Sequence, residues 1–263
     1  MLGDGLLAST DTLVAGVDWR DEWSTPSDVG WKAIMVNASD IAAMGGQPAW
    51  FLVSLVVPPG FDVDAFYDGA IEASAVVGAT IVGGDLSSGR TAVVTVTALG
   101  HADRPLLRSG AQIGDRVWVT GPVGAAAADL RDFRRVGDRP GAAPRRKSGG
   151  EAHRRPVARV AAGLAAATAG ATAMIDLSDG FVADAAHVAE ASGLSLALDT
   201  VPIAVGATRG DALYGGDDYE LLATAPPGVD LDGWIGIGAC ASGPHAVTID
   251  GFLVDPHGWE HEL

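Results

Sequence analysis

The sequence predicts a mixed α/β protein (α/β with α+β character) of two domains, in which strands and helices alternate along the whole chain. Three observations support this prediction. The 263 residues suffice for two ordinary domains, and 48% hydrophobic against 19% charged residues allow a sizeable core. Runs rich in β-branched residues alternate with segments of helical spacing. In both halves an apolar run leads through small residues into an aspartate.

The first half of the chain is expected to hold two helices among four strands. Thr25-Pro26-Ser27-Asp28 offers an N-cap, a proline at the first helical position and an acid in the first turn. This helix is expected to run to about Met44, where Gly45-Gly46 and Pro48 end it. Asp62 is expected to cap the second helix. The expected strands are 6–8, 49–57, 80–82 and 92–98.

The second half is expected to form a sandwich-like α/β domain. Residues 104–114 read as a junction, which predicts an N-terminal domain over 1–107 and a C-terminal domain over 108–263. In the latter, the expected helices are 124–133, 156–169 and 180–192. The expected strands are 115–120, 173–176, 194–199, 219–225, 234–238 and 247–254.

A basic segment interrupts this domain. Residues 131–155 contain nine of the 17 basic residues and three acidic ones. An anion-binding arm is one interpretation. Because the segment is also rich in glycine and proline, we interpret 134–155 as a flexible solvated loop.

Composition excludes several classes of function. The net charge of −16 argues against nucleic-acid binding, which needs phosphate-neutralising cations. No apolar run approaches the ~20 residues that span a bilayer, and the first residues do not form a signal peptide. The single cysteine excludes an internal disulfide. Neither lysine lies in a P-loop motif, and the histidines lack zinc spacing. A cytoplasmic protein without membrane or nucleic-acid partners is expected.

The recurring aspartates indicate the chemistry. Apolar runs lead into Asp11, Asp85 and Asp176, and Asp40 lies about one turn before the end of the first helix. Two carboxylates ~4 Å apart repel by about 4 kcal/mol at an effective dielectric near 20. Mg²⁺ relieves such repulsion, takes oxygen ligands and bridges carboxylates to substrate phosphates. If these side chains converge, they form a Mg²⁺–phosphate site, although a kinase, a synthetase and a phosphatase remain equally compatible.

Simpler interpretations of single residues stay open. Asp40 could be a solvated surface residue, Asp11 and Asp85 could be turn residues, and Asp179 could cap the following helix. In contrast, Asp176 and Ser178 alternate onto one side of an extended segment.

Two further residues carry two interpretations each. Arg108 could stabilise anionic oxygens or lie on the surface. Tyr67 could stack on a base or, by its helical spacing, pack in the core.

Taken together, the motifs resemble the thiamine-monophosphate kinase family, within the superfamily of aminoimidazole ribonucleotide synthetase and selenophosphate synthetase. Each motif is weak alone, but their order along most of the chain is specific. They are Ser9-Thr10-Asp11, Gly30-Trp31-Lys32-Ala33, Asn37-Ala38-Ser39-Asp40, Gly83-Gly84-Asp85, Arg108-Ser109-Gly110, Ile175-Asp176-Leu177-Ser178-Asp179-Gly180 and Gly215-Gly216-Asp217-Asp218-Tyr219-Glu220.

The resemblance implies ATP-dependent phosphorylation of thiamine monophosphate to thiamine diphosphate by direct in-line transfer, with several Mg²⁺ ions. It also implies a homodimer that pairs through the N-terminal sheets, with ATP near the interface. The implied metal ligands are Ser9, Thr10, Asp11, Asp40, Asp85, Asp176 and Asp179, of which Asp11, Asp40, Asp85 and Asp176 are also expected to be catalytic. The implied ATP contacts are Tyr67, Gly84, Asp85, Arg108 and Ser178. The implied substrate contacts are Asp18, Asp217 and Trp259.

The chain also departs from the family pattern. The family has a Gly-Asp-Asp motif on a strand ahead of Ser-Thr-Asp, and Gly3-Asp4-Gly5 is too close to Ser9 to replace it. We therefore expect an N-terminally truncated member with one metal site incomplete. Asp18 replaces a histidine, Asp217 replaces a glutamate, and 199–215 is shorter than usual. The alternatives are another ATP–Mg²⁺ enzyme of the superfamily and an impaired, non-catalytic nucleotide-binding homologue.

Overall fold

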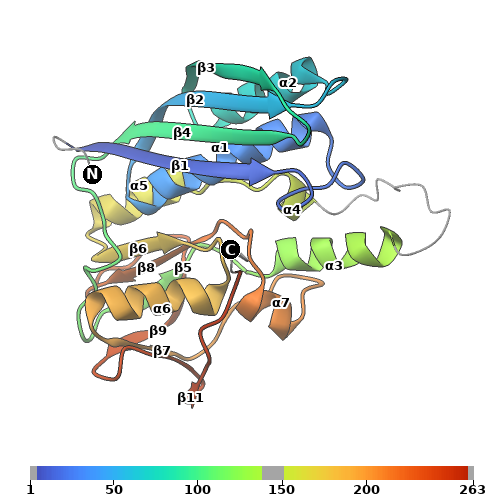
Figure 1. The fold of residues 1–263 in the computed structure, drawn as a ribbon. Helices are drawn as coiled ribbons and strands as arrows, with labels where there is room; N and C mark the ends of the chain where they lie inside the picture. The colour runs from blue at the N-terminus through green and yellow to red at the C-terminus, as the bar shows by residue number, and fades with distance from the viewer. Residues whose placement is uncertain (1–4, 138–150, 260–263) are drawn as a thin grey trace.

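The chain folds into two β-sheets with helices packed between and outside them (Figure 1). The computed structural model describes residues 5–137 and 151–259. The long helix α1 (Pro26–Ala43) contacts strands of both sheets, and α5 (Val160–Ala169) packs beside it. The predicted mixed α/β class is therefore confirmed.

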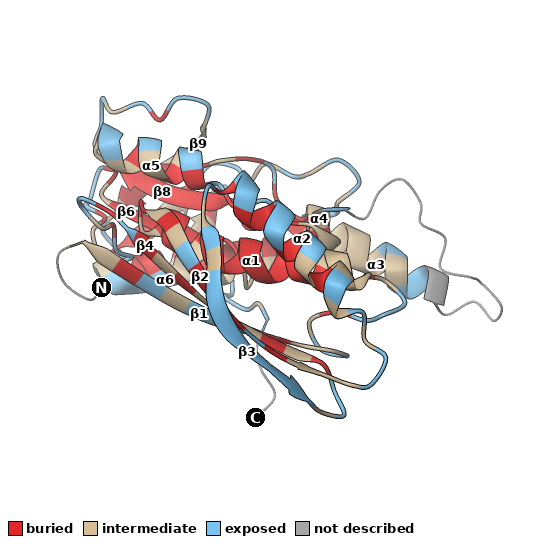
Figure 2. Cartoon of the chain, turned by 90° about the horizontal axis from the view of Figure 1, so that it is seen from above, coloured by how far each residue is buried: buried red, intermediate tan, exposed pale blue. Residues whose placement is uncertain are grey.

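The first sheet is built by the N-terminal part of the chain in the order β1-β4-β2-β3. Only β2 and β3 run parallel; the other neighbours are antiparallel. Its strands are β1 (Leu6–Val14), β2 (Gln47–Val57), β3 (Thr80–Ser88) and β4 (Val93–His101). Helices α1 and α2 (Val63–Val76) cover one face, and the opposite face carries the exposed side chains of Trp50 and Leu52 (Figure 2).

The second sheet has seven strands in the order β11-β10-β7-β9-β5-β8-β6. Its strands are β5 (Arg116–Val119), β6 (Ala173–Asp176), β7 (Ser195–Leu198), β8 (Leu221–Ala225), β9 (Ile235–Ala241), β10 (Val247–Ile249) and β11 (Phe252–Leu253). The remaining helices are α3 (Ala125–Gly137), α4 (Glu151–Arg154), α6 (Phe181–Ser192) and α7 (Arg209–Tyr214). Of the described helices, none is long and apolar enough to cross a membrane.

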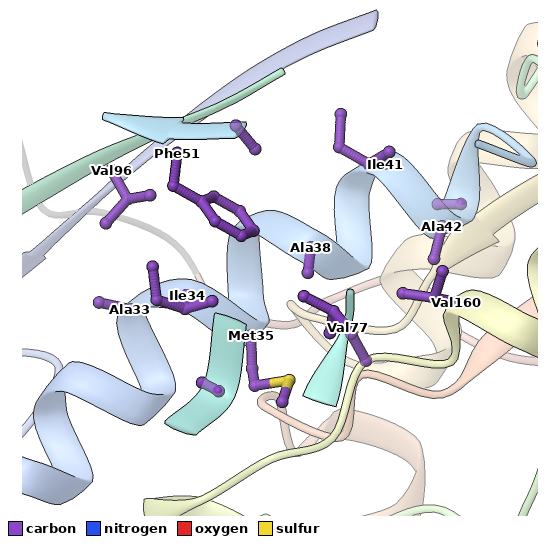
Figure 3. Packing of buried hydrophobic residues seen from close by; sticks show 14 of the residues in the cluster. Ala33, Ile34, Met35, Ala38, Ile41, Ala42, Phe51, Val77, Val96 and Val160 are labelled. Atoms are coloured by element: carbon purple, nitrogen blue, oxygen red, sulfur yellow. The ribbon is translucent and has the colours of Figure 1, made fainter. Parts of the chain in front are cut away.

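Helix α1 forms the centre of the core. Its N-terminus is the predicted one: Thr25 and Asp28 form a capping box, with Pro26 at the first helical position. Fourteen of its eighteen residues are buried, as expected for a helix packed on all sides. Phe51 and Val96 of the first sheet pack on one side of it and Val160 of α5 on another (Figure 3).

The same core cluster reaches the second sheet through Trp118, Met174 and Leu221. A separate cluster under α6 fills the other face of that sheet, with Phe181, Ile175 and Leu222 among its members. The two sheets thus share α1 between them, and polar side chains of α1 reach the boundary between the two halves.

The expected ends of two strands in the first sheet need correction. Strand β1 continues past residue 8 through Asp11, which pairs with Val96, and β3 continues past residue 82 through Asp85, which pairs with Ser54. Asp11 and Asp85 are therefore strand residues, not turn residues. The expected end of β3 at residue 82 was wrong because Gly83-Gly84 also suits a loop. In the strand, Gly84 has a φ of +151°, and a Cβ there would lie 1.8 Å from the carbonyl oxygen of Val53, so glycine is needed for close pairing with β2.

The other differences fall near the basic segment. Residues 134–137 extend α3 and residues 151–154 form α4, so the expected loop 134–155 is too long at both ends. Residues 138–150 lie outside the described part. Helix α5 starts at Val160 rather than at 156, and α7, capped by Thr208 with Asp211, is missing from the expectations.

Candidate functional site

A cavity of about 700 Å³ opens where the two halves of the chain meet. Its lining includes residues that follow β1, residues of α1, α3 and α4, and the segments before α6 and β8. Six of the sequence-predicted site residues line it: Asp11, Asp18, Ser178, Asp179, Asp217 and Trp259.

Helix α1 links the two aspartate-bearing strands beside this cavity. The backbone N–H of Asp11 donates to Asn37 Oδ1 over 3.1 Å. Ser9 Oγ donates to Asp40. On the other side of the helix, Ser39 Oγ donates to Asp176 Oδ2 over 2.6 Å. Two consecutive residues of α1, Ser39 and Asp40, therefore form hydrogen bonds with different halves of the chain, and Asp40 is not a solvated surface residue.

Four carboxylates influence one another here, and we call Asp11, Asp40, Asp176 and Asp179 the aspartate cluster. Burial and the carboxylate of Asp176 raise the pKa of Asp40 to about 8. Burial raises the pKa of Asp176, with Asp11 adding to the effect, and burial followed by Asp179 and Asp18 raises that of Asp11. Arg108 acts in the opposite direction and lowers the pKa of Asp40 and of Asp176. The predicted Arg108 thus lies close enough to affect this cluster.

The side chain of Asp179 does not cap α6. The N-cap of this helix is Gly180, and no side chain caps it. Instead, Asp184 Oδ2 accepts from the N–H groups of Asp179 and Gly180, at 3.1 and 3.2 Å. Burial, with Asp179 and Asp176, raises the pKa of Asp184 to about 8. Ligand atoms of Asp179, Asp184 and His187 also lie within 4.8 Å of one another.

Asp217 has the opposite environment, and we call Asp217, Lys32, His153 and Tyr219 the Asp217 network. Lys32 Nζ and His153 Nδ1 lie 2.8 and 3.1 Å from Asp217 Oδ2, and the Tyr219 hydroxyl donates to Oδ1 over 3.0 Å. Burial alone would raise the pKa of Asp217, but the Lys32 ammonium and His153 hold it well below its usual range. The network joins α1, α4 and the segment before β8.

The backbone around Asp217 is unusual. Asp217 and Tyr219 have φ of +66° and +50°, in the left-handed region. Their N–H groups donate to the carbonyls of Ser178 and Leu177, each over 2.8 Å, and the N–H of Trp259 donates to the carbonyl of Asp179 over 2.8 Å. A Cβ on Gly216 would lie 2.4 Å from the Ser178 carbonyl oxygen. The segments of the predicted ATP and substrate residues are therefore hydrogen-bonded to each other.

Asp18 follows β1 at the cavity wall. Its Oδ2 accepts from the N–H of Val14 over 2.7 Å, and its carbonyl oxygen lies 3.4 Å from Lys32 Nζ. Asp18 and Asp217 therefore both contact the ammonium group of Lys32.

Four predicted residues lie elsewhere in the single chain. Successive strand residues point to opposite faces, so Thr10 points away from Asp11, and its hydroxyl contacts Thr97 Oγ1 at 3.2 Å. Asp85 pairs with exposed Ser54, which places it on the same open face, and Ser87 donates to it. Gly84 lies in the same strand β3. Tyr67 packs edge-on against the buried Phe66, which favours the interpretation of Tyr67 as a core residue over that of a base-stacking residue.

Lys32, His153 and Tyr219 were missed as functional residues by the sequence reasoning. Lys32 was tested as a P-loop lysine and quoted within the motif Gly30-Trp31-Lys32-Ala33, but it was given no role of its own, and His153 falls in the segment interpreted as a loop. The signal that could have identified Lys32 is its charge on a helix that is otherwise apolar around it.

Comparisons with known proteins show which proteins this chain resembles. Residues 2–102 match the family model "AIR synthase related protein, N-terminal domain". Thiamine-monophosphate kinase of Mycobacterium tuberculosis is 41% identical, over 95% of this chain and 78% of that protein. The kinase of Aquifex aeolicus is 34% identical, over 97% and 88%. The solved structure of AaThiL complexed with AMPPCP and TMP has a TM-score of 0.88 and 33% identity, covering 98% of this chain and 87% of that one.

Proposed function

Because the chain belongs to the thiamine-monophosphate kinase family, we propose that it transfers the γ-phosphoryl group of ATP to thiamine monophosphate and releases thiamine diphosphate and ADP. The observation that carries this proposal is the position of the aspartate cluster beside the cavity that also holds Asp18, Asp217 and Trp259. A site that binds phosphates thus lies next to a site large enough for an organic substrate.

Mg²⁺ is the metal that suits this cluster. Asp40 and Asp176 are buried or half-buried among like charges, and their side-chain hydrogen bonds come from the neutral hydroxyls of Ser9 and Ser39. All the donor atoms are hard oxygens, which Mg²⁺ prefers. We therefore propose Asp11, Asp40, Asp176 and Asp179 as its ligands, together with Ser9. When bound, Mg²⁺ would neutralise the carboxylates and the phosphate oxygens.

The protein groups have positioning and electrostatic tasks in this reaction. An oxygen of the substrate phosphate is itself the nucleophile, so that direct in-line transfer needs no protein base and no covalent intermediate. Arg108 is proposed to contact the ATP phosphates, because its charge already acts on Asp40 and Asp176. Ser178 is proposed to contact ATP as well, and Asp18, Asp217 and Trp259 are proposed to hold the thiamine moiety.

A homodimer is part of the proposal. The open face of the first sheet carries Trp50 and Leu52, 49% and 41% exposed, together with Asp85. Exposed apolar side chains on an open sheet face are typical of an interface. Pairing through this face would bring Gly84, Asp85 and Thr10 near ATP at the interface. We expect the enzyme to work in the cytoplasm, where ATP is available.

An activity assay tests the proposed reaction. Purified protein with ATP, Mg²⁺ and thiamine monophosphate is expected to release ADP and to form an equal amount of thiamine diphosphate, measured by chromatography. Unphosphorylated thiamine is the control acceptor and should give no thiamine diphosphate. Absence of thiamine diphosphate at every Mg²⁺ concentration would overturn the proposal.

Light scattering tests the dimer. Leu52→Glu places a charge on the open face and is expected to give monomers, whereas Val205→Glu changes an exposed residue outside this sheet and should leave the dimer intact. A wild-type monomer at micromolar concentration would contradict the proposed pairing.

A further inference from the structure

The Asp217 network brings together groups that lie far apart in the sequence. Lys32 comes from α1, His153 from α4, and Asp217 with Tyr219 from the segment before β8. Lys32 and His153 are only 4% and 5% exposed, whereas the side chain of Asp217 is 30% exposed and lines the cavity. All three side chains line the cavity, and the carboxylate of Asp217 is the most exposed of them.

The hydrogen bonds leave Asp217 one open position. An ionised carboxylate has about four lone-pair positions on its two oxygens. Lys32 and His153 occupy two on Oδ2, and Tyr219 occupies one on Oδ1. Because an ionised carboxylate only accepts, His153 Nδ1 must carry a proton. Counting the partners within residues 5–137 and 151–259, one acceptor position is left for a ligand in the cavity.

The same lysine also reaches the other wall of the cavity. Lys32 Nζ lies 3.4 Å from the carbonyl oxygen of Asp18 and 2.8 Å from Asp217 Oδ2. A single buried ammonium thus fixes the backbone at one proposed substrate residue and the side chain of the other. Neither Lys32 nor His153 belongs to the aspartate cluster, so this pair can act on substrate recognition without acting on the metal site.

We propose that Lys32 and His153 are positioning residues for recognition of the thiamine moiety: they hold Asp217 as an oriented, ionised acceptor for the amino group on the pyrimidine ring of the substrate. This inference rests on the proposed kinase function and deepens it. Without Lys32, the carboxylate would lose its charged partner and its fixed direction. The substrate would then meet a mobile or protonated Asp217.

Steady-state kinetics test the role of Lys32. Lys32→Met is expected to raise KM for thiamine monophosphate at least ~10-fold, while kcat and KM for ATP stay within ~3-fold of wild type. Arg155→Met is the matched control, since Arg155 is a basic residue that pairs with Glu72 and does not line the cavity. Its kinetic constants should equal those of wild type.

A second pair of variants tests His153 without changing a buried charge. His153→Asn can keep a donor near the Nδ1 position and is expected to retain a KM close to that of wild type. His153→Leu removes the donor and is expected to raise KM for thiamine monophosphate at least ~5-fold. This pair decides the question even where Lys32→Met does not fold, which thermal unfolding of each variant will show.

The outcomes separate the two proposals. A wild-type protein that forms no thiamine diphosphate overturns the proposed function. An active wild type, with unchanged KM for thiamine monophosphate in folded Lys32→Met and His153→Leu, overturns the positioning role alone. Equal losses for ATP and thiamine monophosphate would also overturn it, because they indicate a merely structural role.

Discussion

The aspartate cluster and the Asp217 network shift the pKa values of buried carboxylates in opposite directions. In the cluster, burial and like charges raise the pKa of Asp40 to about 8, and the hydroxyl groups of Ser9 and Ser39 donate to Asp40 and Asp176. In the network, Lys32 and His153 lower the pKa of Asp217. The difference concerns the source of the balancing cation: the chain supplies Lys32 to Asp217, whereas the cluster is proposed to take Mg²⁺ from solution.

The largest expected effect concerns catalysis by the cluster. Asp176→Asn keeps the size of the side chain but removes one proposed metal ligand. It should lower kcat by about 10³-fold, or about 4 kcal/mol of transition-state stabilisation. Asp218→Asn is the matched control, because Asp218 accepts from the N–H of Gly124 over 2.7 Å and does not line the cavity. If Asp176→Asn kept more than a tenth of the wild-type kcat, Asp176 would not be a metal ligand required for catalysis.

The pH dependence of stability sharpens the comparison next. Burial raises the pKa of Asp40 and of Asp184 to about 8 in the folded protein, whereas the pKa of an aspartate in an unfolded chain is about 4. The folded state therefore binds more protons between these values, and metal-free stability should fall as pH rises from 5 to 8. The lowered pKa of Asp217 acts oppositely, since its contribution is present above pH ~4 and is lost on acidification.

Thermal unfolding in EDTA and in Mg²⁺ measures this effect. In EDTA the melting temperature should drop steadily from pH 5 to pH 8, and Mg²⁺ should recover most of the loss at pH 8. A melting temperature that rises with pH, or that ignores Mg²⁺, would contradict the account of the cluster.

The smallest expected effects come from single hydrogen bonds. Ser39→Ala removes the hydroxyl that donates to the buried carboxylate of Asp176 over 2.6 Å, and it should cost about 1–2 kcal/mol. Tyr219→Phe removes one of three partners of Asp217 and should cost about 1 kcal/mol or less. Urea unfolding in EDTA measures the free energy of unfolding of both variants. A larger loss of this free energy in Tyr219→Phe than in Ser39→Ala would contradict the expected ranking.

Local signals explain which elements could be predicted. The capping box at Thr25 and Asp28, the cap at Asp62 and the short strand β6 (Ala173–Asp176) depend on neighbouring residues, and the structure confirms them. The ends of β1 and β3 depend on pairing with other strands, and glycines that also suit a loop concealed the length of β3.

The candidate site divides in the same way. The residues next to Asp176 are readable as a motif, so Ser178 and Asp179 could be proposed from the sequence. Lys32 and Asp217 are 185 positions apart, and no local pattern connects them. The direction of Asp85 depends on the register of β3 against β2, which the sequence does not define.

The free energy of unfolding of Asp40→Asn and Asp217→Asn tests the contrast most directly. The two variants make the same chemical change, and both are measured by urea unfolding in EDTA at pH 7. Asp40→Asn should stabilise the protein by about 1–2 kcal/mol, because the amide is neutral in both states, whereas Asp40, with its pKa raised to about 8, must take up a proton when the chain folds at pH 7. Asp217→Asn should destabilise it by about 2–3 kcal/mol, because Lys32 stays buried without its counter-charge. Effects of the same sign would contradict the account.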